Sequence, residues 1–259
     1  HPGAANRRVE YVIGTGKKQP MRDRWVRLES PALDGIEVEI VELDGTEAFN
    51  ALFEFRVRLL TTELDALRKR AQTLLDAEVA LSFEDDGHVV RKIHGMISCL
   101  TYEQPSERER TLLCVTVVPR AWNMTQCYGA EVFVDASVPA VLEAKLSAAG
   151  LQEGRDYRFE LTDIYEAREI IVQYEETDHA FFSRLCEHEG IATYFVHDTG
   201  RDVMVLTDSS ESYRPLTCGV VAVRSRREHP AAYDVATELA RRPGTALVHD
   251  YNYRAPRLD

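Results

Sequence analysis

The chain has 259 residues, of which 44% are apolar and 29% are charged, and its formal net charge is −12. This length is sufficient for a large hydrophobic core, and the composition is typical of a globular protein rather than a disordered or fibrous one. The acidic charge argues against a nucleic-acid-binding protein, because affinity for phosphate comes mainly from clustered lysines and arginines. We therefore expect a globular protein with no nucleic acid among its partners.

Targeting signals are not evident in the sequence. No apolar stretch approaches the roughly 18 residues that a membrane-spanning helix needs, and the N-terminus lacks the apolar core of a signal peptide. The chain begins His1-Pro2-Gly3, which is not a translation start, so we expect a processed chain or a fragment of a longer protein. The interpretation is a protein made in the cytoplasm without a signal peptide.

The five cysteines are widely spaced and form no Cys-x-x-Cys pair. Such a pattern predicts buried free thiols in a reducing compartment, where cysteine behaves as a small hydrophobic residue. They are Cys99, Cys114, Cys127, Cys186 and Cys218.

The first half of the chain is dominated by strand patterns. Residues 1–23 show no periodicity and are predicted to be a flexible or partner-ordered arm. Apolar and polar side chains then alternate at residues 25–29, 36–41 and 53–59, which predicts half-buried strands. Leucines and alanine recur at helical spacing over residues 64–75 and predict one short surface helix.

Three further strands are predicted at residues 79–83, 89–102 and 111–118. The Asp-Gly pair at residues 86–87 predicts a hairpin turn between the first two of them. Because no crossover helices alternate with these strands, the sequence predicts an antiparallel meander.

Two helices are predicted in the second half of the chain. Ser137 is a candidate cap of the first, which Gly150 closes, and Thr177 is a candidate cap of the second, which Gly190 closes. The predicted buried stripe of the second helix is Phe181, Phe182, Leu185 and Cys186.

Strands are predicted again at residues 191–196 and 203–206, and further strands near 220–223 and 246–251. The fold class predicted from these patterns is β-rich α+β, with two β lobes and a few packed helices. We expect an arm at residues 1–23, a first lobe at 24–207 and the start of a second lobe at 208–259.

No motif for catalysis, metal binding or cofactor binding is present. Glu187, His188 and Glu189 are followed by His197, but His188 has no histidine four residues away on one helical face, as a zinc protease requires. We therefore predict no catalytic, metal or cofactor site. The alternative is a hydrolase that uses His188 or His197 with a nearby carboxylate or with Cys186, since such partners meet in space rather than in sequence.

Several stretches resemble, in order, the hub domain of VgrG spike proteins of type VI secretion and the tail-hub proteins of contractile phages. Residues 45–55 resemble the family's acidic entry into a long strand, and His94-Gly95 resembles its F-x-G strand. Residues 117–122 resemble its V-P-R-L-W corner, and residues 134–139 its S-V-P helix entry. The resemblance extends over roughly residues 28–256.

The most specific stretch is residues 172–191, which resembles the family segment V-Q-Y-x-E-S-D-x-x-F-x-x-R-L-x-E-x-E-G-I at nearly every position. We expect its residues to have a structural role or to form a protomer interface. Arg184 can pair with Glu187 or reach back toward Asp178 or Glu176. The candidate residues are Gln173, Tyr174, Glu176, Asp178, Phe181, Arg184, Leu185, Glu187, Glu189 and Gly190.

The resemblance implies two tube-type antiparallel β-barrel lobes with helical insertions. It implies a structural hub rather than an enzyme, with three copies in a ring that caps a hexameric tube protein and carries the puncturing tip. The implied partners are other copies of the chain, which form a homotrimer, the tube protein and baseplate subunits. A tip protein and effectors are implied to bind through a C-terminal region beyond residue 259. The implied location is the cytoplasm before assembly and the outside or a target cell after firing. The alternative within this class is the hub of a contractile phage tail or tailocin baseplate.

Overall fold

The computed structural model describes residues 9–10, 24–85, 87–103, 111–197 and 199–213. The chain divides into two compact units, His1–Tyr213 and Arg214–Asp259, and every described residue belongs to the first. The predictions for most of the arm, for the hairpin residue Asp86, and for the strands near residues 220–223 and 246–251 lie outside the described residues.

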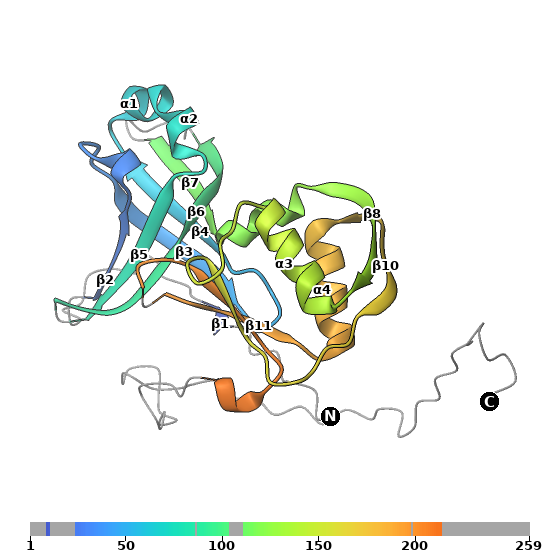
Figure 1. The fold of residues 1–259 in the computed structure, drawn as a ribbon. Helices are drawn as coiled ribbons and strands as arrows, with labels where there is room; N and C mark the ends of the chain where they lie inside the picture. The colour runs from blue at the N-terminus through green and yellow to red at the C-terminus, as the bar shows by residue number, and fades with distance from the viewer. Residues whose placement is uncertain (1–8, 11–23, 86, 104–110, 198, 214–259) are drawn as a thin grey trace, which may run out of the picture. The chain divides into compact units, whose positions relative to one another are not determined.

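A seven-stranded antiparallel sheet forms the larger part of the first unit, and it curves strongly (Figure 1). Its strand order is β1-β3-β4-β7-β6-β5-β2, so the meander β5-β6-β7 lies in sequence order, as predicted. The strands are β1 (Val9–Glu10), β2 (Arg24–Glu29), β3 (Glu39–Glu47), β4 (Glu54–Thr61), β5 (Glu78–Asp85), β6 (His88–Glu103) and β7 (Thr111–Val118).

The sheet buries one face in a core of aliphatic and aromatic side chains, including Phe55, Val57, Leu81 and Ile97. Alternate residues of β4 are buried, which is the period-2 pattern expected of a strand with one wet face. The sequence therefore predicted the buried face of this strand correctly.

The single helix predicted over residues 64–75 is wrong. The structure has two short helices, α1 (Leu64–Lys69) and α2 (Ala71–Leu74), separated at Arg70. The Arg70 Nη1 atom donates hydrogen bonds to the carbonyl oxygens of Ala32 and Asp34, at 3.3 and 2.6 Å. This tertiary contact holds the break in place while leucines on both sides of it remain buried.

The rest of the unit is an α/β part with its own core. A two-stranded ribbon of β8 (Tyr128–Ala136) and β10 (Arg168–Thr177) is covered on one face by α3 (Val138–Ala148) and α4 (Asp178–Glu189) (Figure 1). A three-stranded sheet has the order β11-β12-β9, from Ala192–Val196, Val203–Thr207 and Tyr157–Glu160. Three 3-10 turns complete the described elements: η1 (Pro31–Leu33), η2 (Arg120–Thr125) and η3 (Ser210–Ser212).

The two predicted helices of this part are confirmed. Phe181, Phe182, Leu185 and Cys186 are all buried on α4. The Thr177 hydroxyl accepts a hydrogen bond from the Ala180 backbone N–H at 3.1 Å, as a helix cap does. Ser137 occupies the cap position of α3, but its side chain makes no capping hydrogen bond there.

Strands β8, β9 and β10 were not predicted as elements. The outward side chains of β8 and β10 are themselves apolar, so the ribbon lacks the alternation that marks a half-buried strand. Strand β9 has only four residues, and its pairing with β12 is parallel, the one parallel pair among the described strands.

The prediction that the cysteines are buried is wrong for two of them. Cys99 and Cys127 are exposed, Cys114 is half-buried and Cys186 is buried; all four are free thiols. Cys99 follows a register shift in the β6–β7 pairing, which changes the face of the sheet to which later residues of β6 point. Cys218 lies outside the described residues.

No helix within the described residues is long and apolar enough to cross a membrane.

Gly95 on β6 lies where a larger residue does not fit. A Cβ atom at this position would lie 2.6 Å from the Val118 carbonyl oxygen and 3.1 Å from the Val117 Cγ1 atom. We expect Gly95→Ala to lower the free energy of unfolding by about 1–3 kcal/mol, because the backbone of β7 must move. Urea unfolding of the purified chain measures this change.

Gly129 on β8 provides the matched control, because a Cβ atom there meets nothing within 4 Å. Gly129→Ala should change the free energy of unfolding by less than about 1 kcal/mol, with a slight stabilisation expected in a strand. Equal losses in both variants would contradict the steric explanation for Gly95.

Candidate functional site

The candidate residues of the segment 172–191 occupy the end of β10 and the whole of α4. The β8–β10 register pairs Gln173 with Glu131 and Glu176 with Gly129. Tyr174 and Glu175 therefore oppose a single residue of β8, which is a β-bulge. Glu175 has a positive φ of 45°, the region that non-glycine residues rarely adopt. Before the bulge the strand alternates in the ordinary way, with Gln173 1% exposed and Tyr174 70% exposed.

A buried charged cluster joins four elements of this part. The Lys145 ammonium of α3 donates to the Asp178 Oδ1 atom of α4 at 2.9 Å and contacts the Glu131 Oε2 atom of β8 at 2.6 Å. The Gln173 Nε2 atom of β10 donates to the same Asp178 oxygen at 2.9 Å and to the Glu176 carbonyl oxygen at 3.1 Å. Asp178 and Gln173 therefore act as an internal connection between strand and helix.

The environment of Lys145 keeps its ammonium charged. Burial alone would lower the pKa of Lys145, but the hydrogen bonds to Glu131 and Asp178 outweigh it and raise the pKa above its ordinary value. The ammonium also lies 5.7 and 5.8 Å from the ring centres of Phe133 and Phe181, within the range of a cation–π contact.

Arg184 holds α4 against the outer part of the bulge. Of the partners considered for it, the structure has Glu176, with an ion pair at 2.5 Å. The Nη2 atom of Arg184 also donates to the Val172 carbonyl oxygen at 3.1 Å, and its guanidinium lies 5.3 Å from the Phe181 ring centre. Phe181 and Leu185 are buried beneath it.

The end of α4 is fixed by a glycine and an ion pair. Gly190 has a φ of 70° and terminates the helix in the left-handed conformation, and the Ile191 N–H donates to the Cys186 carbonyl oxygen at 2.8 Å. Glu189 forms an ion pair with Arg168 at the start of β10. Glu187 is exposed, and its carbonyl oxygen accepts a hydrogen bond from the Gly190 N–H at 3.4 Å.

A second charged corner lies where β7 ends. The Arg120 backbone N–H donates to the Asp202 Oδ2 atom at 2.6 Å, and its guanidinium pairs with Asp202 and with Glu78. Asp202 is 1% exposed, and burial raises its pKa to about 6 against the opposing charge of Arg120. This corner ties the large sheet to the loop before β12.

Asp208 anchors the loop that precedes β10. Its carboxylate accepts hydrogen bonds from the Thr162 N–H and hydroxyl at 2.9 Å, from the Asp163 N–H at 2.8 Å and from the Tyr165 hydroxyl at 3.0 Å. One side chain therefore satisfies four donors of residues 162–165.

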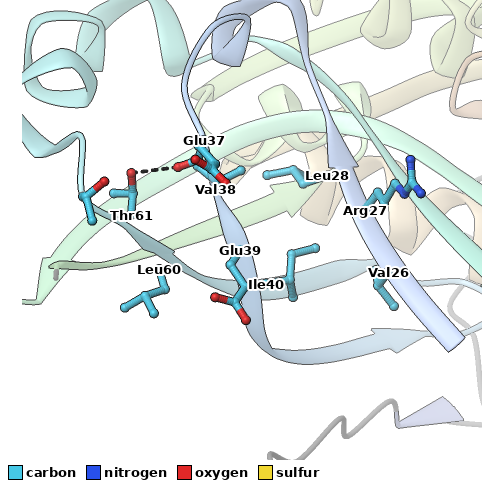
Figure 2. A pocket seen from close by; sticks show the side chains of 10 residues that line it. Val26, Arg27, Leu28, Glu37, Val38, Glu39, Ile40, Leu60 and Thr61 are labelled. Atoms are coloured by element: carbon cyan, nitrogen blue, oxygen red, sulfur yellow. Dashed lines mark hydrogen bonds between the residues drawn. The ribbon is translucent and has the colours of Figure 1, made fainter. Parts of the chain in front are cut away.

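The cleft between β2 and the start of β3 has a volume of about 630 Å³ (Figure 2). Its charged lining consists of Arg27, Glu37 and Glu39, and the Thr61 hydroxyl donates to the Glu37 carbonyl oxygen at 2.9 Å. None of the ten described residues that line it is a histidine, cysteine, serine or lysine, and the groups in it that can carry a proton are the carboxylates of Glu37 and Glu39.

The residues of the hydrolase alternative have different surroundings. His188 is exposed at the end of α4, whereas the His197 Nδ1 atom accepts a hydrogen bond from the His94 N–H at 3.1 Å and its ring contacts Phe53. Burial raises the pKa of Cys186 to about 12, so its thiol stays protonated. Among the described residues, no three or more histidine, cysteine, aspartate or glutamate side chains come together in a group that could hold a metal ion.

The arrangement of a curved antiparallel sheet with this α/β part agrees with the comparisons. The family model of the phage tail baseplate hub (GPD) matches residues 46–259. The chain belongs to this hub family. The β-rich fold and the resemblance inferred from the segment 172–191 are thereby confirmed.

Relatives of this hub chain are spike proteins. The chain is 27% identical over 245 residues to the type VI secretion system spike protein VgrG1a of Pseudomonas aeruginosa, covering 90% of this chain and 36% of that protein. It is 26% identical over 244 residues to the spike protein VgrG3 of Vibrio cholerae, covering 86% of this chain and 23% of that protein. The chain thus spans about a third or less of the length of these relatives.

A solved structure shows the same fold. The E. coli c3393 protein, described as a component of the type VI secretion system with structural similarity to the T4 bacteriophage tail proteins gp27 and gp5, superposes with a TM-score of 0.67 at 23% identity. The match covers 78% of this hub chain and 53% of the solved chain.

Sequence reasoning missed Lys145 and Asp202 as partners of the charged clusters. A signal existed for Lys145, because it lies between Leu142 and Leu146 on the apolar stripe of α3, where a charge requires a buried partner. Asp202 follows the polar turn after β11 and has no comparable signal.

Lys145→Met should destabilise the hub chain strongly. The variant leaves Asp178 nearly buried without its cation, so we expect the free energy of unfolding to fall by about 3 kcal/mol. Lys92→Met is the control, because the Lys92 and Glu29 side chains are 38% and 47% exposed and such a pair contributes less than about 1 kcal/mol. Chemical denaturation measures both, and equal effects would show that the Lys145 cluster is not a buried charged pair.

Asp208→Asn should make the stability of the chain less dependent on pH in the acidic range. Burial would raise the pKa of Asp208, but its four hydrogen bonds outweigh this and lower the pKa below its ordinary value. Its contribution is therefore present above about pH 4 and is lost as pH falls through the lowered folded-state pKa.

The melting temperature of the parent chain should exceed that of Asp208→Asn at pH 7, and the difference should shrink as pH falls from 5 to about 2. Glu143→Gln, at an exposed position of α3, should show no such convergence. A difference between parent and Asp208→Asn that stays constant with pH would contradict the role given to the carboxylate.

Proposed function

We propose that the chain is the structural hub of a contractile injection spike, of the type VI secretion kind. In this proposal three copies form a ring that caps a hexameric tube protein, and the ring carries the puncturing tip and effectors. The hub-family match over residues 46–259 is the observation that supports the proposal most strongly. The spike proteins among its relatives favour the secretion context.

The chemistry of the described residues supports a mechanical role. The ten candidate residues of β10 and α4 include Gln173, Asp178, Arg184 and Glu189, whose polar groups bond to other parts of the same unit. The Lys145–Asp178 pair is buried, and the Arg184–Glu176 and Arg168–Glu189 pairs are partly exposed. Together such networks fix the orientation of elements that must move as one body. We infer that these residues position the α/β part within the hub and that the hub performs no chemical reaction.

The hub of a contractile phage tail or tailocin baseplate is the second candidate, and the description of the matching family favours it. Both candidates predict the same ring, so its partners distinguish them. Binding to a tube protein of a secretion system, and not to a phage tail tube, would support the secretion context. In that context the protein is made inside the cell and leaves it on the spike.

The mass of the complete gene product in solution tests the ring. Light scattering after size exclusion, over a range of concentrations, should give three times the mass of one chain. A strict monomer over the whole range would contradict the proposed function. Substitution of His188 by alanine should leave the mass unchanged, because the residue is exposed and outside the buried clusters.

A further inference from the structure

The outer face of the β8–β10 ribbon is apolar and exposed. The exposed fractions are 59% for Val132, 63% for Val134, 59% for Ile170, 41% for Val172 and 70% for Tyr174. The register places Val132 opposite Val172 and Val134 opposite Ile170, so the four aliphatic side chains are contiguous. These five residues are called the outer ribbon face below.

The opposite face of the ribbon is fully used inside the unit. Ile171 and Gln173 are buried, and Phe133 packs against the core beneath α3 and α4. Successive residues of a strand point to opposite faces, so the outer ribbon face cannot turn inward without exposing this core. No other described segment covers it, since all five of its side chains are exposed.

The size of the outer ribbon face fits an interface. Its exposed area is on the order of 500 Å², which matches the largest apolar patches of typical monomers, about 300–600 Å² and often functional, and is close to the apolar share of a standard interface of about 800 Å² per partner. Single exposed valines need no explanation, but five adjacent apolar residues on one face do.

The backbone is strained at one end of this face. Glu175 has a positive φ of 45°, which non-glycine residues rarely adopt, whereas Asp135 at the other end has a φ of 50°, which aspartate tolerates better. Tyr174 points outward and Gln173 inward by the ordinary alternation of a strand, and the bulge interrupts this alternation at Glu175. Strain of this kind persists where the surrounding structure imposes it and is common at functional surfaces.

We propose that the outer ribbon face is the contact surface for a second copy of this chain within the hub ring, an inference that rests on the proposed function. Interfaces between copies are the most apolar class, and their centres are depleted of charge, as this face is. A chain of net charge −12 repels its own copies, so contact between copies needs a patch where carboxylates are excluded. The acidic ribbon residues Glu131 and Glu169 are not part of the outer ribbon face, whereas the exposed Asp135 and Glu175 lie at its two ends.

Ile170→Glu in the complete gene product tests the surface, because it adds a carboxylate to the pair that Ile170 forms with Val134 on the outer ribbon face. Light scattering should show the parent at three times the mass of one chain and Ile170→Glu at the mass of one chain. Ile170 is 59% exposed, so the melting temperature should remain near that of the parent. Ile170→Ser, which adds no charge, should raise the dissociation constant of the ring by about tenfold.

Val90→Glu is the matched control. Val90 is a β-branched strand residue with an exposed fraction of 66%, outside the ribbon, so its variant should keep the mass of the parent. Loss of the ring in Val90→Glu as well would overturn the inference, because charge anywhere on the chain would then suffice.

The failure of this inference can be distinguished from the failure of the proposed function. A parent that is three-fold with an Ile170→Glu variant that is also three-fold overturns the inference and leaves the proposed function intact. If that three-fold variant no longer binds the tube ring, the outer ribbon face meets another protein and the inference is equally overturned. A parent that is a monomer at every concentration contradicts the proposed function and this inference with it.

Discussion

One buried cation organises the α/β part of this hub chain. Lys145 on α3 bonds to the first residue of α4 and to β8, and Gln173 brings β10 to the same carboxylate. An ammonium that is taken out of water must be compensated completely, so the four elements can adopt only the arrangement that brings these groups together. The rest of the candidate site depends on this arrangement, because the bulge, the Arg184 ion pair and the helix end all follow from where α4 begins.

The same constraint explains why only one face of the β8–β10 ribbon packs against the helices. With Gln173 and Ile171 held against the helices, the alternate residues of β10 must face away from them. The inner face packs Gln173 together with the apolar Ile171 and Phe133, and the outer face is apolar as well, whereas the outer face of a free-standing surface strand is polar. A surface of this composition is more readily understood as one side of an assembly than as the wet exterior of a monomer.

The large sheet is stabilised by apolar packing and not by a buried cation. Its core is apolar, and its junction with the α/β part is made by the Arg120–Asp202 corner and by Phe53, which packs against Phe195 at 5.1 Å. The ionic corner gives the junction a defined geometry that apolar contacts alone do not specify. The chain belongs to the baseplate hub family, and a junction of defined geometry agrees with the structural role proposed for it.

Much of this architecture is readable from local patterns. Strands β2 to β7 of the large sheet and the helix at residues 178–189 follow from side-chain periodicity, whereas β1 lies in the stretch predicted as an arm. The segment 172–191 pointed to the hub family. These features depend on spacing along the chain, where the periods of 2 and 3.6 residues are set by backbone geometry.

Tertiary structure decided the features that depend on partners distant in sequence. The break at Arg70 is set by carbonyls 36 and 38 residues away, and the corner at Asp202 by an arginine 82 residues away. The ribbon escaped prediction because its outer residues are as apolar as its inner ones, so the sequence alone carries no sign of which face is buried. That choice is made by the carboxylate of Asp178 and the ammonium of Lys145, 33 residues apart in the chain and 2.9 Å apart in the fold.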